Sequence, residues 1–429
     1  MPVLKNAATL CLLLLVACSG DKPAPGGAGA AASAASAGPT TSAAPAVTTV
    51  SAVQPPEASA APKGSGVSGF KPGSEDAACK LKTAEIANYI QRPGMSLAGR
   101  ASDGTFAAVW LVELQNKPDA QIAFAGFDVE AKQVARARSI GATRTEGLRV
   151  FDTGGAWAVT WFDAEGLTHA RPRWETSPPP EIQHLAAVGK EASDNVAITW
   201  TPSGSLVAAA PFGPERDQLG VFLFAPTDSS QPSVKAVGVT HYAKQARRPA
   251  IAADAGGYYV AWHEEDGSIR ASRFDLSGKE GEAHVIAPAG PKRERVALAA
   301  IGAGALALWA EGETLVVRAL DGSAGPAGPA WVVGTGKWGA FAAGGSGALV
   351  AWIGSDGKAE GQVLLARLGP DGAPSAQGLR VTDSATPVKD KPALAVAGGR
   401  VGVTWTEAMS PGVSSKRAMI RVLEASCLP

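Results

Sequence analysis

A short apolar segment recurs along the chain and constrains its fold more than any other feature. The copies read FAAVW, WAVTW, LVAAAP, YVAW, ALALW, LVAW and VGVTW. Their alignment gives one column that contains Trp110, Trp161, Pro211, Trp262, Trp309, Trp352 and Trp405. The intervals along this column are 51, 50, 51, 47, 43 and 53 residues. A repeat of this length is a supersecondary unit that buries its apolar face only against neighbouring copies.

Each repeat carries signals for four strands. An apolar stretch and a glycine turn precede the column segment, as at 249–252, 296–299 and 392–395. A second turn follows, often Asp-Gly, and leads to a third strand such as IRASRFD or GQVLLARL. A fourth short strand such as AHVIA or GLRVT completes the repeat. Four antiparallel strands at a period of about 40 to 50 residues predict an all-β fold, a seven-bladed β-propeller of four-stranded blades.

The N-terminus has the features of an export signal. Lys5 precedes an apolar run over 7–16 that has the length of a signal-peptide core and is short for a bilayer span. The run ends in LVAC at Cys18, which resembles the lipobox of bacterial lipoproteins. The resemblance implies that Cys18 becomes the lipidated first residue, whose acyl chains, palmitate among them, anchor the protein durably. Ser19 in place of Asp implies sorting to the outer membrane of the cell envelope. The alternative is a plain secretory signal in which Cys18 has no role.

Composition divides the chain into three segments. Residues 1–18 are the predicted signal and lipobox. Residues 19–74 are mostly Ala, Ser, Pro, Gly and Thr with hardly any charge, which is typical of a disordered linker. Residues 75–429 are the predicted propeller.

The last repeat lacks a fourth strand. Its strands are expected at 392–397, 400–407 and 416–423, after which the chain ends. The segment 80–90 precedes the first repeat, so this N-terminal strand can complete the last blade and close the ring. With one cysteine removed in the signal and Cys18 lipidated, Cys79 and Cys427 remain, at the same end of these two strands. We predict a disulfide between them, as an oxidising compartment allows.

The repeats resemble a known group, the secreted propeller repeats of bacteria. The resemblance rests on phrases such as GGYYVAWHEEDGSIRASRFD and LLARLGPDGAPSAQGLRVTDSATP, in which a G-x-x-x-V-x-W strand is combined with an I-x-x-x-R strand and a D-G turn. It covers about 80–425. It implies the fold and an extracytoplasmic setting, but no shared reaction. The chain contains no Trp-Asp dipeptide, and its Gly-Gly pairs precede the tryptophan strand, unlike those of kelch repeats.

Motifs for catalysis and cofactors are absent from the sequence. His263 and Glu264 begin like an H-E-x-x-H zinc site, but Gly267 replaces the second histidine and the segment reads as a strand, so His263 is expected at the surface or rim. The G-x-G-x-x-G match at 334–339 joins two strands with no helix to bind a pyrophosphate. We therefore predict no catalytic residue, no metal site and no cofactor. With 39 basic and 39 acidic residues, nothing points to a nucleic-acid partner.

Charged residues recur at fixed places in the repeats. A basic residue begins the innermost strand and an acidic one ends the tryptophan strand, which predicts cross-strand ion pairs. The expected pairs are Arg92 with Glu113, Arg144 with Asp163, Arg248 with Glu264, Arg295 with Glu311 and Lys391 with Glu407.

The charges outside these pairs form the candidate ligand-binding patch. It lies in the loops that enter repeats four and five and in the turn between them, and it comprises His241, Tyr242, Lys244, Arg247, His263, Glu265, Lys292 and Arg293. Such a cationic patch at a propeller mouth could bind an anionic sugar, a phosphate or a peptide carboxylate. The alternative is a set of solvated loops.

Two functions from different classes remain. The first is a membrane-anchored binding or scaffold module, expected to be monomeric, that presents a loop face to a cell-envelope protein or an anionic glycan. The second is a sialidase-like or lyase-like propeller enzyme acting on an anionic saccharide. An enzyme needs an acid or base in the channel mouth, whereas the innermost strands here are Ala, Val, Leu and Ile, which favours binding.

Overall fold

The structure, a computed structural model, describes the second of two units. The chain divides into residues 1–54 and 55–429, and every described residue lies in the latter. The described residues are 61–64, 66–72, 81–90, 95–113, 120–143, 146–163, 166–172, 182–186, 196–212, 218–225, 233–240, 247–290, 293–302, 304–357, 361–382, 388, 390–409 and 416–428. The predicted signal, Cys18 and Cys79 lie outside them.

Four groups of four consecutive strands each form one antiparallel sheet, and each group is named here by its first strand. The β3 group is β3 (Ser96–Gly99), β4 (Phe106–Glu113), β5 (Ala120–Phe127) and β6 (Gln133–Thr143). The β7 group is β7 (Glu146–Asp152), β8 (Trp157–Asp163), β9 (Gly166–Ala170) and β10 (Ile182–Ala186). The β11 group is β11 (Ala197–Trp200), β12 (Leu206–Phe212), β13 (Gln218–Ala225) and β14 (Ser233–Thr240). The β15 group is β15 (Arg247–Asp254), β16 (Gly257–His263), β17 (Ile269–Asp275) and β18 (Glu280–Ala287).

An eight-stranded sheet follows and divides within one long strand. It contains β19 (Arg293–Ile301), β20 (Gly304–Glu311), β21 (Thr314–Leu320), β22 (Pro326–Gly344), β23 (Gly347–Gly354), β24 (Gln362–Leu368) and β25 (Gln377–Arg380), with β1 (Gly69–Pro72) at its edge. Residues 326–335 of β22 pair with β21, and residues 336–344 pair with β23. The first part of β22 therefore ends the β19 group and the second part begins the β22 group. The G-x-G-x-x-G match lies inside this strand, with no helix after it.

The last sheet combines the two ends of the described chain. It contains β26 (Ala393–Ala397), β27 (Arg400–Ala408), β28 (Lys416–Glu424) and β2 (Lys82–Ile90), in the order β2-β28-β27-β26. A short 3₁₀ turn over Ala425–Cys427 follows β28. Cys427 is disulfide-bonded, and its pairing with Cys79, which lies outside the described residues, stays a prediction.

The column residues all lie in the second strand of their groups. The tryptophans are in β4, β8, β16, β20, β23 and β27, and Pro211 is in β12. Trp262 and Trp352, for example, are fully buried, because successive sheets pack face to face and share their apolar side chains. One such core joins Leu308 and Val317 of the β19 group to Val350 of the β22 group. These placements confirm the all-β prediction of four-stranded antiparallel repeats.

A glycine begins the second strand in three successive groups. Gly257, Gly304 and Gly347 each stand five residues before the column tryptophan. A Cβ added at Gly347 would overlap the carbonyl oxygen of Leu368, which ends the third strand, and the same overlap occurs at the other two. Only a residue without a side chain fits this close approach of two backbones.

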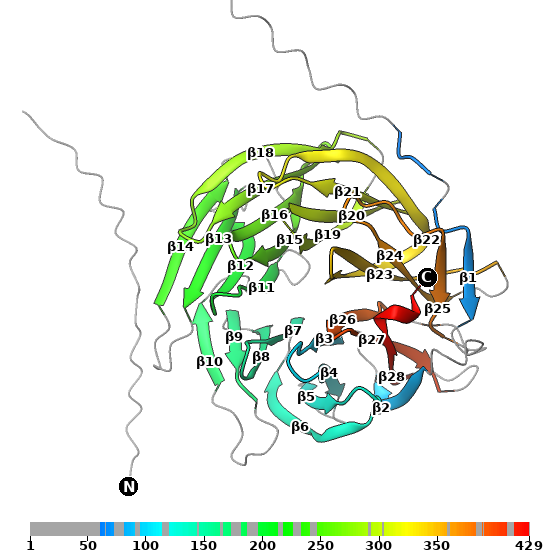
Figure 1. Cartoon of the computed structure of the whole chain (residues 1–429). Helices are drawn as coiled ribbons and strands as arrows, with labels where there is room; N and C mark the ends of the chain where they lie inside the picture. Colours follow the sequence, from blue (N-terminus) through cyan, green and yellow to red (C-terminus); the bar gives the residue numbers. More distant parts are fainter. Residues whose placement is uncertain are drawn as a thin grey trace, which may run out of the picture. The chain divides into compact units, whose positions relative to one another are not determined.

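The first strands of the groups surround a common centre. Contacts join β3 to β7, β7 to β11, β11 to β15, β15 to β19, β19 to β22, β22 to β26, and β26 to β3. Figure 1 shows β3, β7, β11, β15 and β26 toward the centre, with β6, β10, β14 and β18 outside. This radial arrangement of four-stranded sheets is that of a β-propeller.

Part of the predicted linker is a strand. β1 pairs in parallel with β25, and the Lys63 N–H donates to the carbonyl oxygen of Ala330 at 2.8 Å. Phe70 packs edge-on against Trp352, with 5.7 Å between ring centroids. The predicted boundary at residue 75 is therefore wrong. The outer edge of β25 offers unpaired backbone groups, which a segment of low hydrophobicity can satisfy.

Candidate functional site

The inner strands of two groups contain a β-bulge next to the centre. The pairing of β15 with β16 shifts between Arg247 and Ala250, and that of β19 with β20 shifts between Glu294 and Ala297. Arg248 and Arg295 lie in these bulges with left-handed backbone angles, φ 51° and φ 43°. A bulge directs a side chain out of the regular ladder, so these two guanidinium groups do not follow the alternation of their strands.

Lys391 occupies the same position in the β26 group. Ala393 pairs with the residue before the column tryptophan, as Ala250 and Ala297 do in their groups. Lys391, Arg248 and Arg295 each lie two residues before the alanine of their own group. The fold therefore repeats one cationic position in three of its groups.

The predicted ion pairs of these cations are wrong. In four groups the carboxylate two residues after the column tryptophan accepts a hydrogen bond from the indole N–H. The pairs are Trp161 with Asp163 at 3.2 Å, Trp262 with Glu264 at 2.9 Å, Trp309 with Glu311 at 3.0 Å and Trp405 with Glu407 at 3.0 Å. Three of these carboxylates also pair with arginines that the sequence analysis did not assign to them: Arg270 with Glu264 at 3.4 Å, Arg293 with Glu311 at 2.8 Å and Arg417 with Glu407 at 2.6 Å.

The bulge explains the wrong pairing, because it inserts residues into one strand and shifts its register against the other. In the β15 and β19 groups this shift displaces Arg248 and Arg295 from the carboxylates. Of the other two predicted pairs, Arg92 and Arg144 lie outside the described residues.

Arg293 is a structural residue rather than part of a binding patch. Its side chain is 6% exposed, and its Nε donates to Glu311 at 2.8 Å. Its Nη1 donates to the carbonyl oxygens of Gly267 and Pro288. The prediction that Arg293 stands outside the ion pairs is therefore wrong, since its guanidinium joins the end of β20 to two loops.

His263 is buried, and the prediction of a surface or rim position is wrong. It is 7% exposed, and its Nε2 accepts a hydrogen bond from the Val296 N–H at 3.2 Å. Burial, and then the positive charges of Arg248 and Arg293, lower the pKa of His263 to about 4. The imidazole is therefore neutral at neutral pH and connects the β15 and β19 groups as an acceptor.

The rest of the predicted patch stays a prediction. His241, Tyr242, Lys244 and Lys292 lie outside the described residues. The backbone of Arg247 pairs with that of His263, and Glu265 is exposed in the turn after β16.

A fourth cation, Arg149, comes from the opposite side of the centre. It lies in β7, where Arg149 pairs with Thr160, the residue before the column tryptophan. Arg149 is exposed to solvent although nearby protein atoms reduce its hydration, and its Nη1 donates to the carbonyl oxygen of Leu148 at 2.8 Å. Its pKa is lowered by this desolvation and then by the positive charge of Arg295, which therefore lies near it. We call Arg149, Arg248, Arg295 and Lys391 the cationic mouth.

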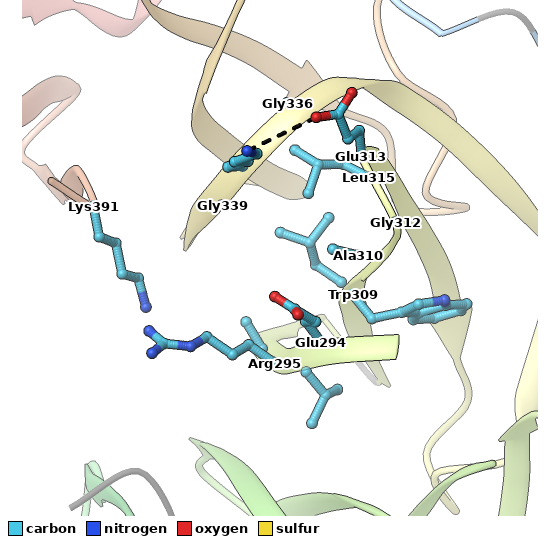
Figure 2. Close-up of a pocket in the computed structure, with 14 residues that line it drawn as sticks. Glu294, Arg295, Trp309, Ala310, Gly312, Glu313, Leu315, Gly336, Gly339 and Lys391 are labelled. Atoms are coloured by element: carbon cyan, nitrogen blue, oxygen red, sulfur yellow. Dashed lines mark ion pairs between the residues drawn. The ribbon is translucent and has the colours of Figure 1, made fainter. Parts of the chain in front are cut away.

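A pocket of about 370 Å³ opens beside the cationic mouth between β20 and β22. Figure 2 shows Arg295 and Lys391 extending toward one another at one end of it. At the other end Glu313 pairs with Lys337 at 3.8 Å, and both side chains are well exposed. The lining residues are Glu294, Arg295, Val296, Ala297, Leu308, Trp309, Ala310, Gly312, Glu313, Leu315, Gly336, Lys337, Gly339 and Lys391.

The described residues contain neither a metal-binding cluster nor a membrane-spanning helix. No group of three or more His, Cys, Asp and Glu in this part of the chain could hold a metal ion. No helix in the same residues is long and apolar enough to cross a membrane.

Comparison with known proteins gives likenesses of architecture. No family model and no curated protein matches the chain. The WD40 domain of SCAP from fission yeast is 11% identical over 81% of this chain and 98% of that one, with a TM-score of 0.48. The GH93 α-L-arabinofuranosidase of Fusarium graminearum is 9% identical over 81% and 98%, with a TM-score of 0.44. The six-bladed lectin of Aleuria aurantia is 13% identical over 70% and 99%, with a TM-score of 0.41. None of these likenesses assigns an activity.

The cationic mouth is the feature that sequence analysis missed. The sequence pattern assigns Arg248, Arg295 and Lys391 to ion pairs and gives no signal for Arg149. The signal that could have corrected this is the repeated Trp-x-Asp/Glu spacing, because on a strand these two side chains lie on one face. That spacing already gives each carboxylate an indole partner.

Proposed function

We propose that this chain is a non-catalytic binding module of the cell envelope, whose propeller presents the cationic mouth to an anionic glycan. The observation that carries the proposal is the proximity of Arg295 to Arg149 and to Lys391, and Arg248 holds the inner-strand position equivalent to that of Arg295. Several cations around one opening attract anionic groups and strengthen the hydrogen bonds made to them.

We further infer a ring of seven blades closed by the N-terminal strand. Division of the eight-stranded sheet within β22 gives seven groups of four strands, since β2 supplies the fourth strand of the β26 group. The contact of β26 with β3 supports closure of the ring. Each group then contributes the start of one inner strand to the same mouth, which is why cations distant in sequence meet there.

The distribution of apolar surface favours a glycan over a protein partner. The large apolar side chains exposed among the described residues are Val134, Ile182, Leu276 and Val285. They lie on outer strands or beside them, away from the mouth. Stable protein interfaces have an apolar and aromatic core, whereas acidic polysaccharides are held through charge-assisted hydrogen bonds.

The anchor is tested by Cys18→Ala. We expect the variant to leave the membrane fraction completely, because one residue carries all of the lipid. Cell fractionation followed by a salt wash and immunoblotting measures this. The matched control is Cys11→Ala, which lies within the predicted signal and should stay with the membranes. If Cys18→Ala still sedimented with the washed membranes, the prediction of a lipid anchor at Cys18 would be wrong.

The mouth is tested with polygalacturonate, a polymer of carboxylated sugars, and with neutral dextran. For the detergent-purified full chain we expect binding of the first only, by isothermal titration calorimetry. The double variant Arg149→Ser/Arg248→Ser should bind at least about tenfold more weakly, with a flatter dependence on salt, because two charge-assisted contacts are lost.

Arg400→Ser is the matched control for charge. Arg400 pairs with Glu424 at 2.6 Å and stands at the start of β27, at the end of the sheet away from the mouth. It should bind the polymer as the native chain does. Equal binding by the double variant, or equal binding of dextran, would contradict the proposal.

A further inference from the structure

We infer that the pocket between β20 and β22 binds a small molecule that has one carboxylate and an apolar body, with the carboxylate held by Arg295 and Lys391. The inference rests on the proposed function in that these two cations belong to the same mouth. It adds a second, smaller ligand whose recognition depends on a cavity as well as on charge.

The pocket exists because one repeat position holds glycine. Gly339 directly precedes Ala340 of β22. Ala340 pairs with Ala351, the residue before Trp352. At the equivalent position the β7 and β19 groups have Leu148 and Val296, both buried. The β15 and β26 groups have a buried proline there. The β22 group alone of these five has no side chain at this position, and Gly339 lines the pocket.

Apolar side chains form the inner wall of this space. Leu308 packs directly against Gly339, since an added Cβ would overlap its Cδ2 at 2.8 Å and would lie 3.9 Å from Cδ1 of Leu315; a larger residue at 339 would therefore push Leu308 within the pocket wall. Leu308 and Leu315 are almost fully buried, and the half-buried Ala310 lies beside them on β20. The volume of about 370 Å³ is at the lower end of the range for small-molecule sites, and these walls suit a ring or a short acyl chain.

Two cations close the solvent side. Arg295 and Lys391 extend toward one another, with Glu294 beside Arg295, and a ligand carboxylate between the two cations would accept hydrogen bonds from both. The lining contains three basic and two acidic side chains, and one of each forms the Lys337–Glu313 pair. The local charge is therefore positive at the end where Arg295 and Lys391 meet.

The backbone of Arg295 is strained. Its φ of 43° is in the left-handed region that an arginine adopts only with difficulty, whereas Gly147 meets the same requirement in the β7 group with φ 65°. Strain of this kind is typical of ligand clamps. The planar guanidinium suits a carboxylate in particular, since it can donate two parallel hydrogen bonds to it.

The test uses two probes of the same shape, 2-naphthoate and its neutral amide, 2-naphthamide. For the full chain in detergent, isothermal titration calorimetry should show naphthoate binding about ten- to a hundredfold more tightly than the amide, the range expected for hydrogen bonds to a charged group. Arg295→Ser should lose this preference. Gly339→Val should reduce binding of both probes, because its side chain fills the pocket.

Two further variants keep the result decisive. Ala310→Leu narrows the same pocket from the opposite wall and replaces Gly339→Val if that variant has a lowered melting temperature. Arg149→Ser/Arg248→Ser removes mouth charges outside the pocket and should bind naphthoate unchanged while losing polygalacturonate. Equal binding of naphthoate and naphthamide, no binding of either, or unchanged naphthoate binding by Arg295→Ser would overturn the inference. If one of these results were obtained but the native chain still bound polygalacturonate, only the inference would be wrong and the proposed function would be unaffected.

Discussion

Replacement of Arg293 by serine is expected to lower the free energy of unfolding by about 3 to 5 kcal/mol, the effect of breaking a buried ion pair. The substitution removes the partner of Glu311 and leaves the carbonyl oxygens of Gly267 and Pro288 without this donor. The loop after β18 and the turn after β16 would lose their common attachment to β20. Urea unfolding followed by tryptophan fluorescence measures the change.

Arg295→Ser is the control, two residues further along the same strand. Arg295 is exposed, so its replacement should change the free energy of unfolding by no more than about half a kcal/mol. A small effect of Arg293→Ser, comparable with that of the control, would mean that Arg293 is a surface cation after all.

Replacement of Gly347 by alanine is expected to destabilise the protein by about 3 kcal/mol or more, because the added methyl group would overlap the backbone of the neighbouring strand. The carbonyl oxygen of Leu368 occupies the place of the Cβ, and backbone cannot move aside as a flexible side chain can. The two strands would have to separate at the start of β23. The melting temperature from circular dichroism reports the loss.

Gly345→Ala is the matched control in the preceding turn. Gly345 has φ 67° and no atom within 4 Å of an added Cβ, so only the left-handed conformation opposes the change. That should contribute about 1 kcal/mol. Equal losses from both variants would show that strand separation is not required at Gly347.

The ion pairs illustrate where sequence analysis fails. Arg295 and Glu311 are nearly symmetric about their turn, which predicts a cross-strand pair. The shift between Glu294 and Ala297 places Arg293 opposite Glu311 instead. The bulge adds one residue before the apolar stretch that sets the register of the rest of β19, so the apolar pattern gives no sign of it.

The cationic mouth could be predicted only in part, because side-chain direction is not visible in the sequence pattern. The sequence marks Arg248, Arg295 and Lys391 as a repeated basic position, but not the direction of their side chains. Their convergence with Arg149 depends on bulges and on the placing of the β7 and β19 groups around one centre. The pocket depends on the missing side chain of Gly339, which has meaning only when the opposite wall is known.

The sequence by itself determined the all-β class, the repeat of four strands and the column of second-strand residues, because alternation of apolar side chains and turn residues acts over a few neighbours. It also indicated that 80–90 could pair with the last repeat, and β2 does pair with β28. Only the tertiary structure decided the partners of Glu264, Glu311 and Glu407, the burial of His263 and Arg293, and the docking of β1 on β25. These depend on contacts between residues remote in sequence, whose distances are set by how whole sheets pack against one another.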